Sequence, residues 1–319
     1  MKIAFRHVPF NGEQIEELNA VAAAAGCETV WCPHGELPAL SEIADCDALM
    51  GYFPLDMLKS IPKLRWVQTP AAGVERFTKE LFPNPDVILT NCSGAFGVAI
   101  AEYMITGLLM LMRRMPAYMD NQKNHVWKGA GDCRSIYGST ITVVGMGDIG
   151  TKFAMRAKAL GAHVRGVRRR AGDLPEGFDE MFTSDRICEA VRDVDAVVMC
   201  VPGTKGASKL VSAECIAQMR RDTILVNCGR GSTLDEEALI EALRAGKLGG
   251  AVLDVMAVEP LPENSPLWDM ENVILTPHIS GHDNDPINAI SIFEIFKANL
   301  TSFLAGKPLA HVVDVASGY

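Results

Sequence analysis

The sequence predicts an α/β protein of two domains, each built around a mostly parallel sheet. Short apolar runs typical of strands alternate with helical patterns along most of the chain, which is the pattern of parallel sheets. One of these runs, at residues 141–144, leads directly into a glycine-rich turn and then a helix, as in doubly wound sheets. The 319 residues exceed the roughly 250–300 at which single cores usually stop growing, so we expect two domains.

The N-terminal part alternates strands and helices from its first residues. Gly26 is placed to end the first helix, because glycine adopts the left-handed conformation common at helix ends. We expect helices at residues 13–25 and 54–59. We expect strands at residues 2–8, 28–32, 47–52, 64–68 and 87–90.

A long apolar stretch follows and predicts a helix at residues 98–115. It is shorter than the ~20 residues that a membrane span needs and contains Glu102, so we expect a buried helix. Pro116 should bend the chain soon after the helix ends. A polar segment at residues 120–137 follows, with Trp127 as its main apolar anchor.

We place a hinge near Gly97. One domain then comprises residues 1–97 and 284–319, and the other comprises residues 98–283. A last helix at residues 288–304 and the tail at 311–315 resemble elements of the first domain, so the chain is expected to return to it.

The second domain begins with a strand at residues 141–144, the turn Gly145-x-Gly147-x-x-Gly150 and a helix at 148–161. In such a unit the first glycine permits a tight turn, the second lets a pyrophosphate approach the backbone, and the third allows close packing. The phosphates then bind the free N–H groups of the helix N-terminus. A purely structural turn is the alternative, but the flanking strand and helix favour a dinucleotide site.

Further strands and helices complete this domain. Ser212 and Asp235 are predicted N-caps of helices at residues 213–218 and 236–245, and Gly246 ends the second of these. The remaining strands are expected at residues 162–167, 196–201, 224–227, 250–254 and 273–275.

The composition narrows the possible functions. A net charge of −9 argues against a general nucleic-acid binder. The N-terminus lacks the apolar core of a signal peptide, so no export is expected. Nine cysteines occur without a C-x-x-C pair, which predicts buried reduced thiols, no metal site and a reducing cytoplasm.

Three polar residues follow successive strands of the second domain. Arg230 lies between two glycines after one strand, Glu259 follows the next, and His278 follows the last, with Gly281 close behind. Taken alone, each residue has an ordinary explanation. Arg230 could belong to a surface ion pair, Glu259 could be a solvated loop acid, and His278 could be a hydrogen-bonded polar residue. Ligands of open α/β sheets bind at the carboxyl ends of the strands, so together these residues indicate an anion clamp, a carboxylate and an acid/base group.

Several segments resemble the D-2-hydroxyacid dehydrogenases, over most of residues 64–314. This resemblance implies a Rossmann-type dinucleotide domain and a smaller, flavodoxin-like substrate domain that is discontinuous in sequence. The matching segments are VVGMGDIG, DVDAVVMCVPGT, ILVNCGRGSTLDEEAL, AVLDVMAVEPLP, SPLWDMENVILTPHISG and NLTSFLAGKPLAHVVD.

The resemblance also implies roles for the site residues. Arg230 would hold the substrate's carboxylate and carbonyl, and His278 would be the general acid that protonates the carbonyl oxygen. Glu259 would pair with His278 and favour its protonated form. The backbone of Ala72 and Gly73 would bind the substrate's carboxylate, while the nicotinamide supplies the hydride.

The predicted cofactor contacts lie at the glycine turn and at the strand ends after it, and Asp254 among them would hold the nicotinamide carboxamide. They are Gly145, Met146, Gly147, Asp148, Ile149, Gly150, Arg168, Arg169, Arg170, Val201, Pro202, Cys228, Gly229, Asp254, His278 and Gly281.

Two positions depart from the family pattern. The acid that binds the ribose hydroxyls in NAD-using members is absent, and the chain has Arg168-Arg169-Arg170 there. Guanidinium groups can grip a 2′-phosphate, so NADP(H) is preferred over NAD(H); a solvated basic loop is the alternative. Ala207 replaces a frequent hydroxyl residue near the phosphates, which leaves that contact in doubt.

The sequence therefore predicts a cytoplasmic, NADP(H)-dependent reductase of a small 2-oxo acid, such as glyoxylate or hydroxypyruvate, that forms the D-2-hydroxy acid. Two alternatives remain: a dinucleotide-sensing protein like the family's corepressor relatives, and a dehydrogenase of another small anion such as formate or phosphite. We expect neither a membrane nor a nucleic-acid partner. We expect a homodimer, with the helix at residues 98–115 in the contact.

Overall fold

The structure is a computed structural model and describes residues 1–32, 36–282 and 285–315, with the backbone alone at Lys205. The chain forms two compact units, Met1–Phe96 with His282–Tyr319, and Gly97–Gly281. The first boundary lies one residue before the one expected from the sequence. The second expected boundary, at 283/284, lies outside the described residues.

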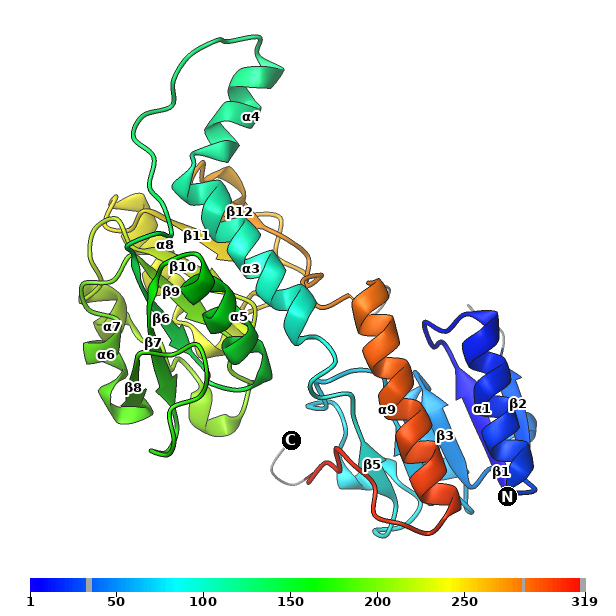
Figure 1. Ribbon diagram of the computed structural model, residues 1–319. Coiled ribbons are helices and arrows are strands. Elements are labelled where there is room, and N and C mark those ends of the chain that lie inside the picture. Colours follow the sequence, from blue (N-terminus) through cyan, green and yellow to red (C-terminus); the bar gives the residue numbers. More distant parts are fainter. Residues whose placement is uncertain (33–35, 283–284, 316–319) are drawn as a thin grey trace. The chain divides into compact units, whose positions relative to one another are not determined.

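The first unit contains a parallel sheet with the strand order β2-β1-β3-β4-β5 (Figure 1). The order reverses between β1 and β3, as in flavodoxin-like folds. Its strands are β1 (Lys2–Arg6), β2 (Glu28–Cys32), β3 (Ala48–Gly51), β4 (Trp66–Gln68) and β5 (Ile88–Thr90). Its helices are α1 (Gly12–Ala24), α2 (Leu40–Ile43), α9 (Pro286–Leu304) and the 3-10 turns η1 (Leu55–Ser60) and η2 (Lys79–Leu81).

Helix α9 and the tail after it belong to this unit through buried polar contacts. The side-chain amide of Asn299 on α9 donates to Gln68 on β4 (2.8 Å) and to the Ala310 carbonyl (3.0 Å). Asn299 and Gln68 are almost completely buried, so these bonds satisfy groups that water cannot reach. Val312 then forms an antiparallel bridge with Thr90. The chain thus returns to its first unit, as expected from the sequence.

The second unit contains a seven-stranded parallel sheet with the order β12-β11-β10-β9-β6-β7-β8. From β6 the chain adds strands in one direction, and after β8 it reverses and adds β9 on the other side of β6. This is the topology of Rossmann-type sheets, with its switch point between β6 and β9. The strands are β6 (Thr140–Val144), β7 (His163–Arg168), β8 (Glu180–Thr183), β9 (Ala196–Met199), β10 (Ile224–Asn227), β11 (Gly250–Leu253) and β12 (Val273–Leu275).

Helices cover both faces of this sheet. α3 (Gly97–Met112) and α5 (Asp148–Ala159) pack together on one face, while α6 (Ile187–Ala190), α7 (Ala213–Ala217) and α8 (Glu236–Arg244) lie on the other (Figure 1). The predicted caps are confirmed, since Ser212 accepts from the Cys215 amide and Asp235 from the Ala238 amide. Four 3-10 turns complete the unit: η3 (Ser184–Arg186), η4 (Lys205–Ala207), η5 (Gly231–Thr233) and η6 (Pro266–Asp269).

The prediction for the segment after α3 is wrong in two respects. Pro116 lies in the first turn of a further helix, α4 (Met115–Lys123), where a missing N–H costs nothing. Trp127 is fully exposed (104%) and anchors nothing within the chain. Figure 1 shows why: α4 and the loop after it extend away from the body of the unit, so no core lies beneath them.

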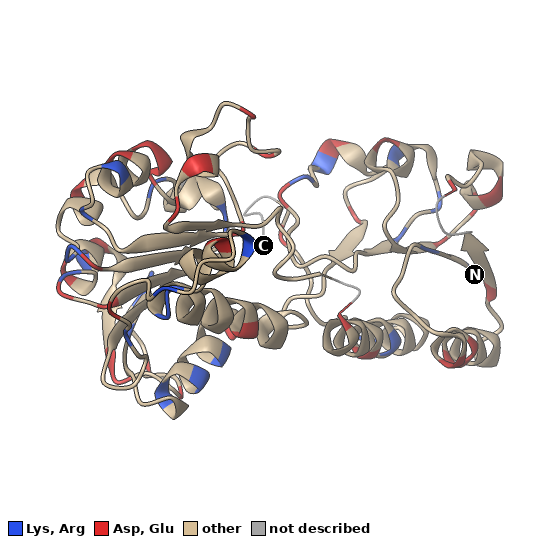
Figure 2. Cartoon of the chain, turned by 90° about the horizontal axis from the view of Figure 1, so that it is seen from above, with Lys and Arg blue, Asp and Glu red and all other residues tan. Residues whose placement is uncertain are grey.

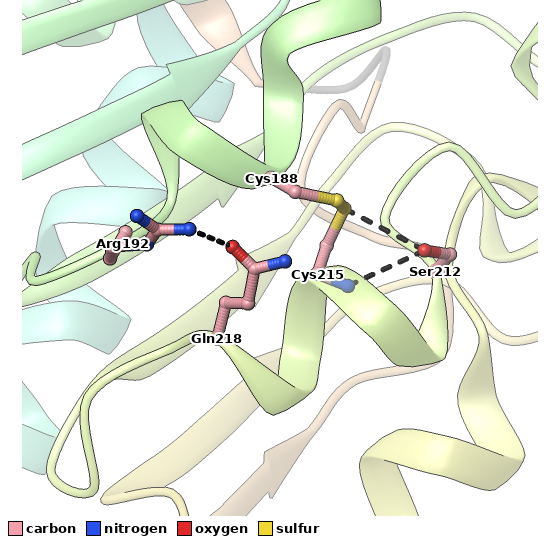
Figure 3. Close-up of a disulfide and its surroundings, with 5 residues drawn as sticks. All are labelled: Cys188, Arg192, Ser212, Cys215 and Gln218. Carbon is pink, nitrogen blue, oxygen red and sulfur yellow. Dashed lines mark hydrogen bonds between the residues drawn. A yellow bond between two sulfur atoms is a disulfide. The ribbon is translucent and has the colours of Figure 1, made fainter.

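The cysteine prediction is also wrong in part. Cys188 on α6 and Cys215 on α7 form a disulfide (Figure 3). The sequence gives no sign of it because the two residues are 27 apart and meet only when α6 packs beside α7. Among the other cysteines, Cys46, Cys92 and Cys228 are buried thiols, whereas Cys133 is an exposed one.

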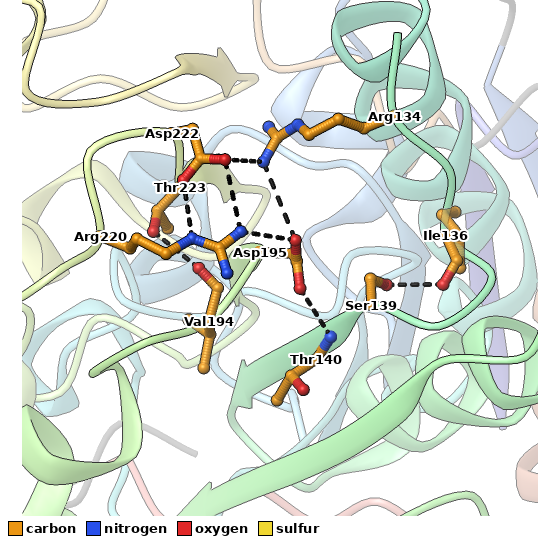
Figure 4. A network of polar contacts seen from close by, with 9 residues as sticks. All are labelled: Arg134, Ile136, Ser139, Thr140, Val194, Asp195, Arg220, Asp222 and Thr223. Atoms are coloured by element: carbon orange, nitrogen blue, oxygen red, sulfur yellow. Dashed lines mark hydrogen bonds and ion pairs between the residues drawn. The ribbon is translucent and has the colours of Figure 1, made fainter.

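The amino edge of the second unit's sheet is held by a polar network (Figure 4). The Asp195 carboxylate accepts from the Thr140 amide (2.8 Å) and from Arg220 (2.7 Å). Arg220 also bonds Asp222, which Arg134 contacts at 3.2 Å. Arg134 lies at the end of the loop that returns from α4, so the network fixes that loop to the sheet. The opposite, carboxyl edge is left for the site.

Lys and Arg are interspersed with Asp and Glu over the helices of both units (Figure 2). In the part of the chain that the structure describes, no helix is both long and apolar enough to cross a membrane.

Candidate active site

The glycine turn has the geometry of a phosphate cradle. Gly145 has a φ of 110°, which side chains rarely adopt, and a Cβ on Gly150 would overlap the Gly145 carbonyl oxygen. Gly147, in contrast, faces open space, with no atom within 4 Å of where its Cβ would be. It is the N-cap of α5 and has no capping side chain, so the first N–H groups of the helix are available to a ligand. These features fit a dinucleotide's pyrophosphate.

The other residues of the turn are constrained by their neighbours. The Met146 thioether lies over Gly166 of β7, where a Cβ would be 2.5 Å from its sulfur. The Asp148 carboxylate lies against Gly97, and burial raises its pKa. Ile149 follows in the first turn of α5. A larger residue at position 97 or 166 would therefore force the Asp148 or the Met146 side chain to shift.

The loops after β9 and β10 meet beside the turn, at the switch point. A Cβ on Gly229 would lie 2.6 Å from the Val201 carbonyl oxygen, so the two loops pack backbone to backbone. Pro202 and Cys228 flank this contact. Cys200, which the sequence did not single out, lies 3.2 Å from the Gly145 carbonyl; burial raises its pKa to about 12, so its thiol stays protonated and donates to that carbonyl.

The three arginines lie at the end of β7. Arg168 is half-buried and donates to the Asp173 carbonyl (3.3 Å), while Arg169 and Arg170 are exposed. β7 neighbours β6, which leads into the glycine turn. In Rossmann-type sheets the end of this strand faces the ribose next to the adenine.

His278 and Glu259 form the predicted pair. The His278 Nδ1 lies 2.9 Å from Glu259 Oε2, and Glu259 Oε1 accepts from the Met256 amide (3.0 Å). Because the carboxylate can only accept, Nδ1 carries a hydrogen and Nε2 is the atom free to gain or lose a proton. Both side chains are partly exposed, 47% for His278 and 39% for Glu259, so a substrate can reach them.

Arg230 is held at the end of β10 by its backbone. Its carbonyl accepts from the Asn227 side-chain amide (3.2 Å) and from the Thr233 hydroxyl (2.6 Å). A Cβ on Gly231 would overlap the backbone of Met256, so only glycine fits after Arg230. The guanidinium donates to the Gly229 carbonyl (2.8 Å) and stays half-buried at the carboxyl edge of the sheet.

Asp254 lies beneath the His278 loop and is 1% exposed. Its carboxylate accepts from the Thr276 hydroxyl (2.6 Å) and from the amides of Ile279 (2.8 Å) and Ser280 (3.0 Å), just before Gly281. Oδ2 receives only one of these bonds, which leaves it a lone pair for a carboxamide N–H. The Tyr103 hydroxyl on α3, which the sequence did not single out, contacts Thr276 Oγ1 at 2.5 Å.

Ala72 and Gly73 belong to the first unit, in the loop after β4 at the carboxyl edge of its sheet. The loop is fixed by Asn91, whose side-chain amide donates to the Ala72 carbonyl (2.8 Å), and by the Cys92 amide, which donates to Ala71 (3.0 Å). The amides of Ala72 and Gly73 have no acceptor among the described residues. They can therefore bind an anion.

No group of three or more His, Cys, Asp or Glu residues within the described ranges is arranged to hold a metal ion.

The model of the D-isomer specific 2-hydroxyacid dehydrogenase NAD-binding domain matches residues 105–280 of this chain. That is more than half of the sequence and includes every strand end described for the second unit. The chain belongs to the D-isomer specific 2-hydroxyacid dehydrogenase family. It is thus an NAD(P)-dependent oxidoreductase with this family's α/β fold.

Similar members of the family include glyoxylate reductases. The enzyme of Korarchaeum cryptofilum is 30% identical, over 88% of this chain and 87% of its own length. That of Thermococcus kodakarensis is also 30% identical, over 95% of this chain and 92% of its own.

Two solved structures of the family extend the comparison to the whole chain. A family member from Aeromonas salmonicida has a TM-score of 0.86 at 31% identity and covers 98% of this chain and 99% of its own. The NADPH-dependent glyoxylate/hydroxypyruvate reductase of Sinorhizobium meliloti, in complex with NADP and sulfate, has a TM-score of 0.81 at 27% identity and covers all of both chains.

Proposed function

We propose that this dehydrogenase uses NADP(H) to reduce a small 2-oxo acid, such as glyoxylate or hydroxypyruvate, to the D-2-hydroxy acid. The observation that carries the proposal is the His278–Glu259 pair at the carboxyl edge of the dinucleotide-binding sheet, with Nε2 free to exchange a proton. The similar proteins named as glyoxylate or hydroxypyruvate reductases support the substrate class.

In this mechanism His278 donates a proton from Nε2 to the carbonyl oxygen of the substrate, and Glu259 holds the ring through its contact with Nδ1. The glycine turn at residues 145–150 would hold the dinucleotide, whose nicotinamide would supply the hydride for the carbonyl carbon. Arg230 binds the substrate's carboxylate and the carbonyl oxygen, where negative charge develops.

A substrate panel tests the proposal against its two alternatives. We expect oxidation of NADPH with glyoxylate or hydroxypyruvate, and no reduction of NADP⁺ with formate or phosphite, whose oxidation needs no carbonyl protonation. A sensor of the corepressor type would bind NADPH without turnover. Activity with formate or phosphite alone would show that the protein is a dehydrogenase of another small anion.

The preference for NADP(H) rests on the arginines after β7. Relatives of known structure that were solved with NADP or NADPH are similar over the full chain, which supports this preference. A phosphate gripped by guanidinium groups gains charge-assisted hydrogen bonds that a ribose hydroxyl cannot provide.

Replacing Arg168 and Arg169 with serine should weaken NADPH binding by about 10- to 100-fold, the range expected for lost hydrogen bonds to charged groups, and change NADH binding little. Fluorescence titration of both cofactors measures this. The matched control is Arg186→Ser, whose exposed guanidinium already forms an ion pair with Glu189 in the segment after β8. An equal loss for both cofactors would reject the phosphate assignment.

We also propose a homodimer. Apolar side chains are exposed along the extension that follows α3, namely Met115, Tyr118, Met119, Val126 and Trp127. A monomer leaves them in water, whereas a second copy would cover them. Sedimentation of the purified protein gives the oligomeric state.

For location we propose the cytoplasm, because Cys46, Cys92 and Cys228 are buried free thiols, as expected in a reducing compartment. The Cys188–Cys215 disulfide is an exception to this pattern.

A further inference from the structure

Helix α3 places one phenol hydroxyl at the edge of the sheet where His278 lies. Tyr103 comes from a helix that is otherwise largely apolar in this stretch, and its hydroxyl contacts Thr276 Oγ1 at 2.5 Å. Thr276 Oγ1 in turn lies 2.6 Å from Asp254 Oδ1. The two contacts join α3 to the ends of β11 and β12.

Only one arrangement of hydrogens satisfies this chain of contacts. The Asp254 carboxylate already accepts from two backbone amides, so the Thr276 hydroxyl must donate its single hydrogen to it. The Thr276 oxygen is then an acceptor, and Tyr103 must be its donor. Burial raises the pKa of Tyr103 to about 12, so the phenol keeps the hydrogen that this bond requires.

The chain of contacts ends on the peptide groups around His278. Asp254 accepts through its carboxylate from the amides of Ile279 and Ser280, and through its carbonyl from the His278 amide (2.8 Å). His278 itself has a φ of 55°, a conformation that costs free energy in a residue with a side chain and persists only where neighbours enforce it. The contacts through Asp254 help to enforce it, together with the bond from the His278 amide to the Thr276 carbonyl (3.0 Å).

We propose that Tyr103 is a positioning residue for His278. Its hydroxyl fixes the rotamer of Thr276, Thr276 fixes the Asp254 carboxylate, and Asp254 holds the loop so that the imidazole meets both Glu259 and the substrate. The proposal rests on the proposed role of His278 as general acid. If the His278 loop loses this support, the proton donor moves from its position. Small displacements of a catalytic group lower the reaction rate by large factors.

Four single variants and the double variant Tyr103→Phe/Thr276→Val test the chain of contacts. Tyr103→Phe and Thr276→Val remove one hydroxyl each at nearly constant shape, and Thr276→Ser restores the hydroxyl. Tyr137→Phe is the matched control, since Tyr137 is 82% exposed and lies at the amino side of β6. We measure kcat, the KM for NADPH and hydrogen exchange of the amides at residues 278–280.

We expect Tyr103→Phe and Thr276→Val each to lower kcat about tenfold, with an unchanged KM for NADPH. The double variant should lose no more than either single one, because both break the same chain. Thr276→Ser should recover the wild-type rate, and Tyr137→Phe should match the wild type. Amide exchange at residues 278–280 should be about tenfold faster in the two damaging variants, with the strand β6 unaffected.

Unchanged exchange at residues 278–280 in Tyr103→Phe would overturn the proposal, as would additive losses in the double variant. The exchange measurement does not require turnover. If the wild type proves inactive with every 2-oxo acid but Tyr103→Phe still loosens this loop, the proposed reaction fails while the coupling of Tyr103 to His278 stands.

Discussion

Replacing His278 with alanine should lower kcat by about 10²- to 10⁴-fold, the usual contribution of a general acid, while leaving the affinity for NADPH within about twofold of the wild type. The Nε2 of His278 lies at the carboxyl edge of the sheet, where it can protonate the carbonyl oxygen of a substrate. It contributes nothing to the glycine turn or to the arginines after β7. Steady-state rates and a separate cofactor titration measure the two effects.

Two further variants sharpen this test. Glu259→Gln keeps a hydrogen-bond acceptor for Nδ1 but removes the charge, so we expect a loss smaller than that of His278→Ala. His163→Ala removes a histidine that is also paired with carboxylates but lies at the amino end of β7, and should leave kcat unchanged. A wild-type rate in His278→Ala would remove this residue from the mechanism.

The second large effect is expected at Arg230. Arg230→Gln should reduce kcat/KM for the 2-oxo acid by about 10²- to 10³-fold, because it removes the charge that stabilises the developing oxyanion. Arg230→Lys should recover only part of the lost kcat/KM, since an ammonium group cannot form the two parallel hydrogen bonds of a guanidinium group.

The matched control for Arg230 is Arg192→Gln. Arg192 bonds the Gln218 side chain away from the carboxyl edge, so its loss should not change kcat/KM. If Arg230→Gln binds and reduces the substrate as well as the wild type does, the proposed anion clamp is wrong.

The fold could be predicted from the sequence where a strand is a short apolar run between turn residues. The sequence predicts β10 with the observed bounds because a buried parallel strand is apolar on both faces. It also predicts β12 with the observed bounds, although β12 is a half-buried edge strand, because Val273–Leu275 is apolar throughout. β8 was missed: Glu180–Thr183 is an edge strand, half-buried throughout, and its four residues carry no comparable apolar signal. The prediction for Trp127 is wrong because a large apolar side chain usually indicates a core, whereas the loop after α4 holds this side chain in solvent.

Only those residues of the candidate site that lie near the ends of strands could be predicted from the sequence. Arg230, Glu259 and His278 each lie in the segment that follows a strand, so parallel topology brings these segments to one edge of the sheet. Tyr103 lies on a helix and is 173 residues from Thr276, and no periodicity or spacing relates the two. The Cys188–Cys215 disulfide was unpredictable for the same reason, because only the packing of two short helices brings the sulfurs together.

The central claim is that the chain reduces a 2-oxo acid with NADPH. Its most direct test is the oxidation of NADPH by the purified protein with glyoxylate and with hydroxypyruvate, followed by the absorbance of the reduced nicotinamide and by the chirality of the glycerate formed from hydroxypyruvate. We predict steady oxidation that depends on the 2-oxo acid and yields the D-isomer. Tight binding of NADPH with no oxidation above the enzyme-free background would contradict the claim.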